Sequence, residues 1–317
     1  MARVHRRTFL WGAVAAGAGA LLPSAAEADT SPAGWSRGEA VAPGRGGAVV
    51  SKAVGAFDVV ALRDSADTFP STQDAMFPSA TATDWRRARR VDPGAFGPDL
   101  AWRLDFRCYA VRRPGGRIAL VDAGVGPAGS PASQWAAPGN LPELLATAHI
   151  DVADVDLVVL THVHEDHMGW SVSTDGVPMF PNAHYVVQGT EVARLSETSP
   201  MRDYLIVPLQ RTGQLREISG QVRLAAAGGS RLTAIPTPGH TVGHQSVLVD
   251  GPDRRLVITG DVLVHAVQLV SPEVGYALEA DQGVAAETRR ELLADARRRD
   301  ATLATAHLTR PFVDARC

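Results

Sequence analysis

The chain has 317 residues, of which 45% are hydrophobic and 21% are charged. This composition is ordinary for a globular protein and excludes the disordered, collagen and coiled-coil classes. The 31 basic and 34 acidic side chains give a formal net charge of −3, so a nucleic-acid or anionic-membrane partner is not expected. The two cysteines, Cys108 and Cys317, are too few for a disulfide scaffold or a cysteine-based zinc site, and whether they pair is left open.

Residues 1–28 have the three parts of a secretory signal peptide. A basic segment ends at Arg7, an uncharged stretch covers residues 9–22, and an A-x-A cleavage site ends at Ala28. The uncharged stretch is shorter than the roughly 20 residues of a membrane-spanning helix. Consecutive arginines followed by x-Phe-Leu resemble a twin-arginine export signal. We therefore expect cleavage near Ala28 and export to the periplasm or the medium, without stable membrane insertion.

Residues 29–56 are rich in Gly, Pro and Ala, which predicts a flexible leader. One domain is expected over residues 57–317, because no repeat or composition break marks a second. Within it, residues 57–63 alternate enough for a strand. Residues 64–102 combine Pro, Ser and Asp with scattered aromatic side chains, which predicts a long loop of the lid or binding type.

From residue 104 onward, strand patterns alternate with helix patterns. Strands are expected over residues 104–111 and 117–122, joined by a Pro-Gly-Gly turn. Helices are expected over residues 141–148, 190–197 and 284–298, the last of them amphipathic. Further strands are expected over residues 157–161, 184–188, 222–226, 232–235, 245–250, 256–259 and 302–306. Many strands with interspersed helices predict a layered α/β sandwich.

Four potential metal ligands directly follow the apolar strand that ends near Leu160. They are His162, His164, Asp166 and His167. Residues i and i+2 of an extended chain face the same side, so His162 and His164 can bind one ion together, and the next turn can direct the other two side chains toward a second ion. The alternative is a solvated polar loop, which we disfavour because the cluster does not stand alone.

Three more ligand-type residues lie at the ends of predicted strands. They are His240 in Pro-Gly-His, Asp261 in Gly-Asp and His307 in Ala-His. Small neighbouring residues let the backbone approach closely at such positions. Imidazole and carboxylate ligands without thiolate favour zinc, with manganese, iron or cobalt as alternatives. The sequence thus predicts a site for two divalent metal ions.

The combined pattern His-x-His-x-Asp-His, Pro-Gly-His-Thr-x-Gly-His, Gly-Asp and Ala-His resembles the metallo-β-lactamase superfamily of hydrolases. The resemblance covers the chain from about Phe57 onward. It implies a single-domain four-layer αββα sandwich with the active site along one edge of two sheets, and a homodimer is compatible with it. By matching position, it implies one metal held by His162, His164 and His240, a second held by Asp166, His167 and His307, and Asp261 as the bridging ligand.

Two close divalent cations would lower the pKa of a bridging water and polarise the electrophilic group, so that a metal-bridging hydroxide could attack. No Ser or Cys nucleophile is then needed, and no G-x-S-x-G motif occurs in the chain. Asp166 is the candidate catalytic acid–base residue, because a carboxylate beside the hydroxide can accept or return a proton.

Four further residues are candidates for the surroundings of the site. His244 is expected to orient a ligand or a loop by hydrogen bonding. Asp122 is expected to accept hydrogen bonds in a turn near the site rather than bind a metal. His265 could line the substrate pocket or cap a strand. Trp170 could form a pocket wall or belong to the core.

The substrate class is indicated by the segment over residues 261–268. Together with the predicted helix 284–298, it resembles the branch of methyl-parathion hydrolases and related lactone or arylester hydrolases. Acyl-homoserine lactonases usually carry a tyrosine three residues after the bridging aspartate, where this chain has Val264. The lack of an obvious basic clamp favours a neutral substrate. We expect a hydrolase of hydrophobic lactones or aryl esters, with organophosphate triesters as side substrates. The alternatives are a β-lactam or thioester hydrolase and a non-catalytic metal-binding scaffold.

Overall fold

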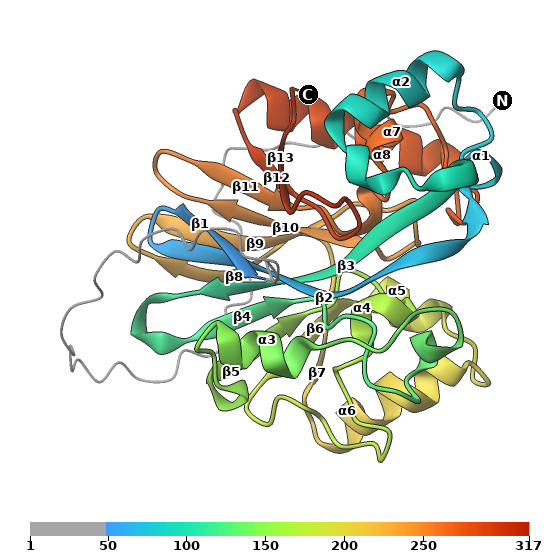
Figure 1. Ribbon diagram of the computed structural model, residues 1–317. Helices are drawn as coiled ribbons and strands as arrows, with labels where there is room; N and C mark the ends of the chain where they lie inside the picture. Colours follow the sequence, from blue (N-terminus) through green and yellow to red (C-terminus); the bar gives the residue numbers. More distant parts are fainter. Residues whose placement is uncertain (1–48, 317) are drawn as a thin grey trace, which may run out of the picture.

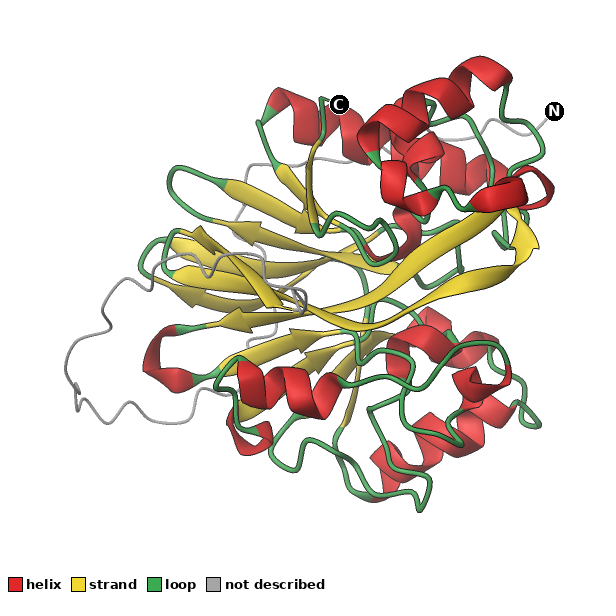
Figure 2. Cartoon of the chain, viewed as in Figure 1, coloured by secondary structure: helices red, strands yellow, loops and turns green. Residues whose placement is uncertain are grey.

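Two β-sheets packed face to face form the centre of the molecule, and helices cover the outer side of each (Figure 1). The computed structural model describes residues 49–316, so the expected signal peptide and most of the expected leader lie outside the described residues. Figure 2 shows the strands of both sheets in the middle, with the helices gathered above and below them. This is the four-layer αββα sandwich that the sequence predicts.

The first sheet contains seven strands that follow chain order, β1 to β7. Its strands are β1 (Val49–Val54), β2 (Phe57–Thr72), β3 (Ala101–Arg112), β4 (Ile118–Val121), β5 (Val155–Val159), β6 (His184–Gln188) and β7 (Leu215–Ile218). Strands β1 to β4 pair antiparallel, and β4 to β7 pair parallel. Parallel pairs require crossover connections. The helices on this side are α3 (Leu141–Thr147), α4 (Glu165–Met168), α5 (Gly189–Arg194) and α6 (Val207–Arg211).

The second sheet contains six strands in the order β13-β12-β11-β10-β9-β8. They are β8 (Val222–Ala227), β9 (Ser230–Pro236), β10 (Gln245–Asp250), β11 (Arg255–Ile258), β12 (Thr302–Ala304) and β13 (Phe312–Asp314). Its outer face is covered by α1 (Gln73–Met76), α2 (Ala82–Val91), α7 (Ala266–Val270) and α8 (Gln282–Arg298). The parallel pair β11 and β12 is connected through α7 and α8.

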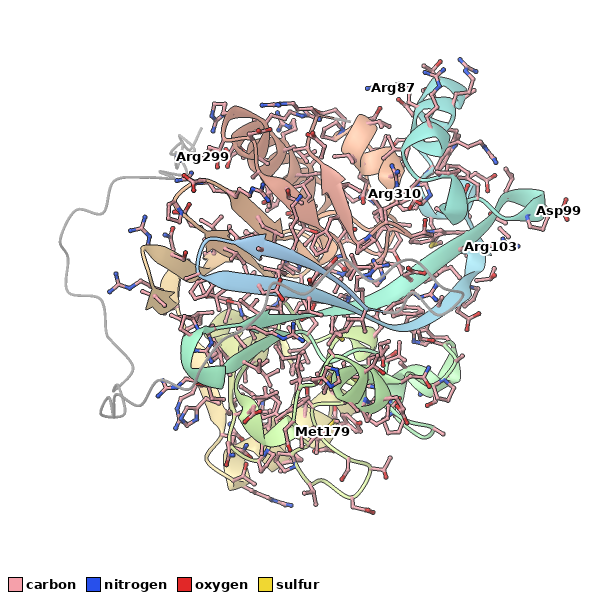
Figure 3. All side chains as sticks on the ribbon, turned by 60° about the vertical axis from the view of Figure 1, so that its left-hand side comes forward. Arg87, Asp99, Arg103, Met179, Arg299 and Arg310 are labelled. Atoms are coloured by element: carbon pink, nitrogen blue, oxygen red, sulfur yellow. The ribbon has the colours of Figure 1, made fainter. Side chains whose placement is uncertain are left out.

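Alternation along the strands lets the first sheet contribute to two cores. In β2, Val60 and Leu62 pack toward the helices, whereas Val59 and Ala61 pack between the two sheets. This is the period of two that strand geometry imposes on side chains. A third core lies between the second sheet and its helices and includes Leu292 of α8. The surface is charged: Arg87 of α2 and Asp99, just before β3, project outward (Figure 3).

Residues 64–102 are not the long loop expected from the sequence. Strand β2 continues to Thr72, α1 and α2 follow, and two 3-10 turns (Pro93–Ala95 and Pro98–Leu100) lead into β3. The pairing of β2 with β3 shifts register between Arg63 and Ser65, which is a β-bulge at Asp64. A bulge interrupts the alternation of side chains, so the sequence shows no period of two at the point where β2 continues beyond Asp64.

Several other boundaries also differ from the expectations. Residues 49–54 fall in the expected flexible leader but form β1, paired with β2. The helix expected over residues 190–197 ends at Arg194, and β7, β13, α4, α6 and α7 were not expected. These elements have three to five residues, too few to show a period. Tertiary packing forms them.

Lys52 connects the two sheets, and Cys108 is a buried thiol. Lys52, the only lysine in the sequence, lies in β1, and its Nζ donates a hydrogen bond to Thr302 Oγ1 of β12 in the other sheet (2.7 Å). Cys108 of β3 is buried as a free thiol, while Cys317 lies outside the described residues. Within residues 49–316, no helix combines the length and apolar composition needed to cross a membrane.

Candidate metal centre

The seven residues expected as metal ligands meet at one edge of the sandwich. They come from loops that leave the carboxyl ends of strands in both sheets: His162, His164, Asp166 and His167 after β5, His240 after β9, Asp261 after β11 and His307 after β12. Ligand residues in such loops are held by a rigid scaffold.

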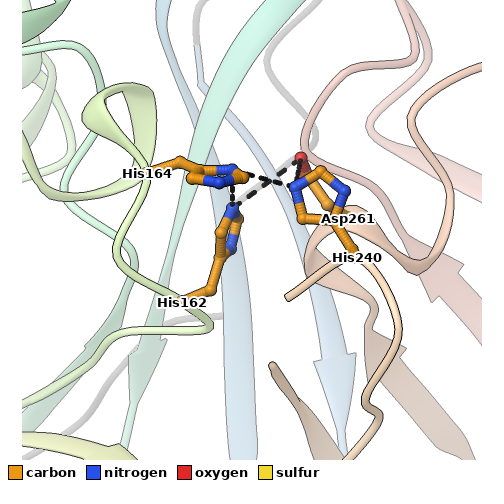
Figure 4. A group of neighbouring side chains, drawn as sticks. All are labelled: His162, His164, His240 and Asp261. Carbon is orange, nitrogen blue, oxygen red and sulfur yellow. Dashed lines mark hydrogen bonds and ion pairs between the residues drawn. The ribbon is translucent and has the colours of Figure 1, made fainter. Parts of the chain in front are cut away.

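The first group consists of His162, His164, His240 and Asp261, whose ligand atoms all lie within 4.8 Å of one another. His164 Nδ1 is 2.9 Å from His162 Nε2 and 2.9 Å from His240 Nε2. Figure 4 shows that His162 and His164 face His240 and Asp261 from opposite sides. The four side chains therefore surround one small volume.

The second group consists of Asp166, His167 and His307, again with ligand atoms within 4.8 Å. His167 Nε2 and His307 Nε2 are 3.2 Å apart. Asp261 lies between the groups: its Oδ2 is 3.2 Å from His240 Nε2, and its Oδ1 is 3.1 Å from His307 Nε2. One carboxylate thus presents an oxygen to each group, which is the position that a shared ligand needs.

Hydrogen bonds on the far side of the imidazoles determine which ring nitrogen faces the cluster. His167 Nδ1 donates to Asp122 Oδ2 (2.8 Å), and His307 Nδ1 donates to the carbonyl oxygen of Asp105 (2.9 Å). With the protons on Nδ1, the two Nε2 lone pairs point at each other. Lone pairs at this separation repel unless a cation lies near both. The donor set and its outer hydrogen bonds therefore fit divalent metal ions.

Burial and neighbouring charges set the pKa values of the cluster residues. Burial alone would raise the pKa of Asp261, but the imidazoles of His307 and His167 outweigh it and hold this pKa well below its usual value. Burial lowers the pKa of His162 and of His240 well below the usual range. Burial alone would lower the pKa of His167 and of His307 as well, but the negative charge of Asp261 outweighs it and raises both. An ionised Asp261 beside neutral His162 and His240 is the protonation state in which the first group binds a metal.

A sequence model of the metallo-beta-lactamase superfamily matches residues 107–307. The chain belongs to this superfamily. It is 34% identical over 117 residues to the N-acyl homoserine lactonase AttM of Rhizobium radiobacter, a match that covers 35% of this chain and 42% of AttM. Matches to the first curated relatives span 42% to 55% of their lengths, about half of each.

Two solved structures share the superfamily fold. The hydrolase AbOPH of the beta-lactamase superfamily superposes with a TM-score of 0.67 at 24% identity, covering 84% of this chain and 92% of AbOPH. AidC, a dizinc quorum-quenching lactonase, also gives a TM-score of 0.67, at 18% identity over 83% of this chain and 91% of AidC.

In this superfamily member, Asp122 acts as the turn acceptor that the sequence indicated. It follows β4 with a positive φ of 60°. Its Oδ1 accepts the backbone N–H of Thr161 (2.7 Å), and its Oδ2 accepts the Thr161 hydroxyl (2.9 Å) as well as the His167 ring. The Thr161 oxygen lies 3.0 Å from His162 Nδ1. Asp122 thus orients one imidazole from each group.

His244 orients the loop of Asp261, as expected. Its Nδ1 donates to the carbonyl oxygen of Thr237 (3.0 Å), so its Nε2 can accept the backbone N–H of Asp261 (3.0 Å). Burial lowers the pKa of His244 to about 4, which keeps the ring neutral for this task. Gly260 has a positive φ of 50°, and a Cβ there would lie 2.6 Å from His244 Nε2. Only glycine leaves room for the contact.

For His265 and Trp170 the sequence allows both a pocket role and a structural one. His265 is buried and caps helix α7 rather than a strand, its Nδ1 accepting the backbone N–H of Val267 (3.0 Å). Four rings surround it at centroid distances of 5.3 to 5.7 Å: Phe77, Trp85, Phe96 and Trp102. Trp170 packs against the core below the first sheet, and its Nε1 donates to Asp64 Oδ1 (3.1 Å). Both contacts favour the structural interpretation.

Glu191 is a buried carboxylate that the sequence did not single out. Its Oε1 accepts the backbone N–H of Val163 (3.2 Å), and its Oε2 accepts that of Gly243 (2.9 Å). These two loops carry His162 and His164 on one side and His240 on the other. Glu191 therefore ties together two parts of the first group from α5, where a glutamate normally faces solvent and gives no signal.

Asp105 and Arg107 of β3 were also missed. The backbone N–H of Asp105 donates to the carbonyl oxygen of His307 (3.2 Å), and Arg107 Nη1 donates to the carbonyl oxygens of Thr305 (3.0 Å) and Leu308 (2.7 Å). The two side chains form a buried ion pair. The sequence did contain a signal, because two charges at i and i+2 interrupt an otherwise apolar strand.

A chain of ring contacts connects His307 to His240 through six aromatic side chains, which we call the aromatic arc. In order they are Phe106, Trp135, Phe69, Trp102, Phe77 and Tyr276, with adjacent ring centroids 4.9 to 6.1 Å apart. Burial, and then the negative charges of Asp261 and Asp166, raise the pKa of Tyr276. The arc thus brings apolar rings against both groups of ligand residues.

Proposed function

We propose that this chain is a dinuclear metal-dependent hydrolase that acts on a neutral, hydrophobic ester, either a lactone or an aryl ester. The observation that carries the proposal is the convergence of five imidazoles and two carboxylates in two adjacent groups that share Asp261. The donor set favours zinc. In this proposal His162, His164 and His240 hold one ion, Asp166, His167 and His307 hold the other, and Asp261 bridges them.

Bound divalent ions would supply Lewis acidity, which polarises an ester carbonyl and acidifies a water molecule. The protein's own task is to hold and orient the reacting groups and to move a proton. Asp166 is suited to the proton step, because its side chain is 11% exposed against 6% for Asp261. A carboxylate at the edge of the cluster can accept a proton and return it to the leaving oxygen.

The aromatic arc supports an apolar substrate. Its rings adjoin His307 and His240 directly, at 5.6 Å and 6.1 Å between centroids. Phe69 and Trp135 are the partly buried rings of the arc, so planar and apolar groups of an ester would pack on these two, with the buried rings behind them. The lactonase names of AttM and AidC support the lactone branch of the proposal. Organophosphate triesters, β-lactams and thioesters are the other substrate classes to be assayed.

The function is tested by metal content, turnover and one ligand variant. We expect about two equivalents of zinc per chain, turnover of γ- and δ-lactones or aryl acetates, and loss of turnover with a chelator. Asp261→Ala should lose both metal equivalents and reduce turnover by at least about 1000-fold, because it removes the shared ligand.

The matched control is Asp253→Ala, an exposed carboxylate in the turn before β11. It should keep both metals and full turnover. Full turnover in Asp261→Ala would exclude the bridging role. One equivalent of metal or none in the wild type, with no activity on lactones, aryl acetates, paraoxon-type triesters or nitrocefin, would instead support a non-catalytic scaffold.

A further inference from the structure

Tyr276 is a buried phenol beside the ligand cluster. It lies between α7 and α8 and is 5% exposed. Its ring is nearly parallel to the imidazole of His240, at 8° and 6.1 Å between centroids. Phe77 stacks on it at 5.3 Å, and Trp102 meets it edge-on at 5.9 Å. The Tyr276 ring is therefore held between Phe77 and Trp102 on one side and His240 of the first group on the other.

The hydroxyl of Tyr276 has no hydrogen-bond partner within residues 49–316. The other three tyrosines of the chain differ in this respect. Tyr109 donates to the carbonyl oxygens of Thr305 and Pro311, Tyr185 to that of Ser171, and Tyr204 to those of Gly169 and Val172. Buried phenol hydroxyls normally find a partner. The Tyr276 oxygen is not among the fully buried polar atoms that lack a partner, so it stays accessible beside the candidate metal centre, which points to a partner that is not part of the protein.

The backbone around Tyr276 is tied to the turn that carries His240. The backbone N–H of Tyr276 donates to Glu279 Oε2 (3.1 Å), and Glu279 forms a buried ion pair with Arg289 of α8. The backbone N–H of Ala280 donates to the carbonyl oxygen of His240 (3.0 Å). Ring and ligand are thus positioned by one framework, as a group that contacts substrate requires.

We propose that the Tyr276 hydroxyl donates a hydrogen bond to the carbonyl oxygen of the ester as negative charge develops on that oxygen. The inference rests on the hydrolase function proposed above. A phenol carries its proton at neutral pH and is a hydrogen-bond donor. The proton stays on Tyr276 throughout, and no bond to the phenol oxygen forms or breaks. A donor aimed at developing charge acts mainly in the transition state, so it raises kcat more than it lowers KM.

The test compares Tyr276→Phe with Tyr185→Phe on aryl acetate hydrolysis, zinc content and the midpoint of thermal unfolding. Tyr276→Phe should lower kcat by about 100-fold and leave KM within twofold. Because it removes no hydrogen bond within the protein, it should keep zinc content and Tm at the wild-type values. Tyr185→Phe should give the opposite result, a lower Tm with unchanged kcat, because its hydroxyl is paired with Ser171.

Each remaining outcome contradicts the proposal in an identifiable way. An active wild type with an equally active Tyr276→Phe overturns the role of Tyr276 and leaves the hydrolase function standing. A Tyr276→Phe variant that loses zinc or unfolds earlier shows a structural role instead. A wild type without esterase or lactonase activity overturns the proposed function, and the role of Tyr276 falls with it.

Discussion

At the scale of single residues, Asp64 shows how a buried acid can organise the surroundings of the site. It sits at the bulge in β2, where its Oδ2 accepts the backbone N–H of Val125 (2.8 Å) and its Oδ1 accepts the Trp170 indole. A Cβ on Gly124 or on Gly139 would lie within 2.1 Å of a carboxyl oxygen of Asp64. The loops after β4 therefore close around this side chain, and its burial raises its pKa.

Asp64 should make stability depend on pH between about 4 and 6. Burial raises its pKa from 3.8 to about 6, against the opposing effect of the Val125 and Trp170 hydrogen bonds. A folded-state pKa above the unfolded value means that the folded protein binds the proton more tightly, so stability falls as pH rises through this window. In Asp64→Asn this loss should be absent, and the variant should gain about 2 to 3 kcal/mol relative to wild type between pH 4 and pH 7.

Urea unfolding at several pH values measures the difference. Subtracting the curves cancels the titration of the ligand imidazoles, which both proteins share. Asp175→Asn, at an exposed carboxyl, controls for the loss of one charge. Parallel stability curves for Asp64→Asn and wild type would contradict the assignment.

At the scale of elements, α5 couples two ligand loops through Glu191. Glu191→Ala should leave the N–H groups of Val163 and Gly243 without an acceptor, which costs about 2 to 4 kcal/mol of unfolding free energy. It should also weaken zinc binding by at least about 10-fold, because the loops of His164 and His240 lose their common support. Glu191→Gln keeps one acceptor oxygen and should fall between.

Urea unfolding of chelator-treated protein and a zinc competition titration measure the two effects separately. Glu197→Ala, an exposed glutamate just after α5, should change neither. If Glu191→Ala binds zinc as tightly as wild type, the coupling between the loops does not control the site.

The same scale shows what could be predicted from the sequence. The strand over residues 245–250 matches β10, and the helix expected over residues 284–298 is α8 (Gln282–Arg298), because both have a clear apolar period. The ligand residues were predictable from residue type and position after strands. Glu191 and Tyr276 were not, because their contacts join segments far apart in the chain. The loop predicted over residues 64–102 was wrong because a bulge in β2 interrupts the alternation of side chains.

At the scale of the whole molecule, the candidate metal centre depends on both sheets. His162 follows a strand of the first sheet, whereas Asp261 and His307 follow strands of the second. The ligand set is thus complete only once the two halves have packed together. The expected twin-arginine route carries proteins that are already folded. We therefore propose that metal is acquired before export.

Mass spectrometry and metal analysis test this order. The exported protein should begin at Asp29, after cleavage following Ala28, and the uncleaved precursor from the cytoplasm should already contain about two equivalents of zinc. Replacing Arg6 and Arg7 by Lys should retain the precursor inside the cell. Recovery of exported protein with residues 1–28 intact would contradict the predicted signal peptide.

The hydrogen bond from Lys52 to Thr302 joins the two sheets at the one side chain that amine-directed reagents can modify. Since the sequence has only one lysine, an acylating reagent directed at side-chain amines has a single target, and that target closes the gap between β1 and β12. Its rate of modification would report how often the Lys52 amine leaves Thr302. Coupling to a solid support through the same amine would attach the protein at this contact between the two sheets.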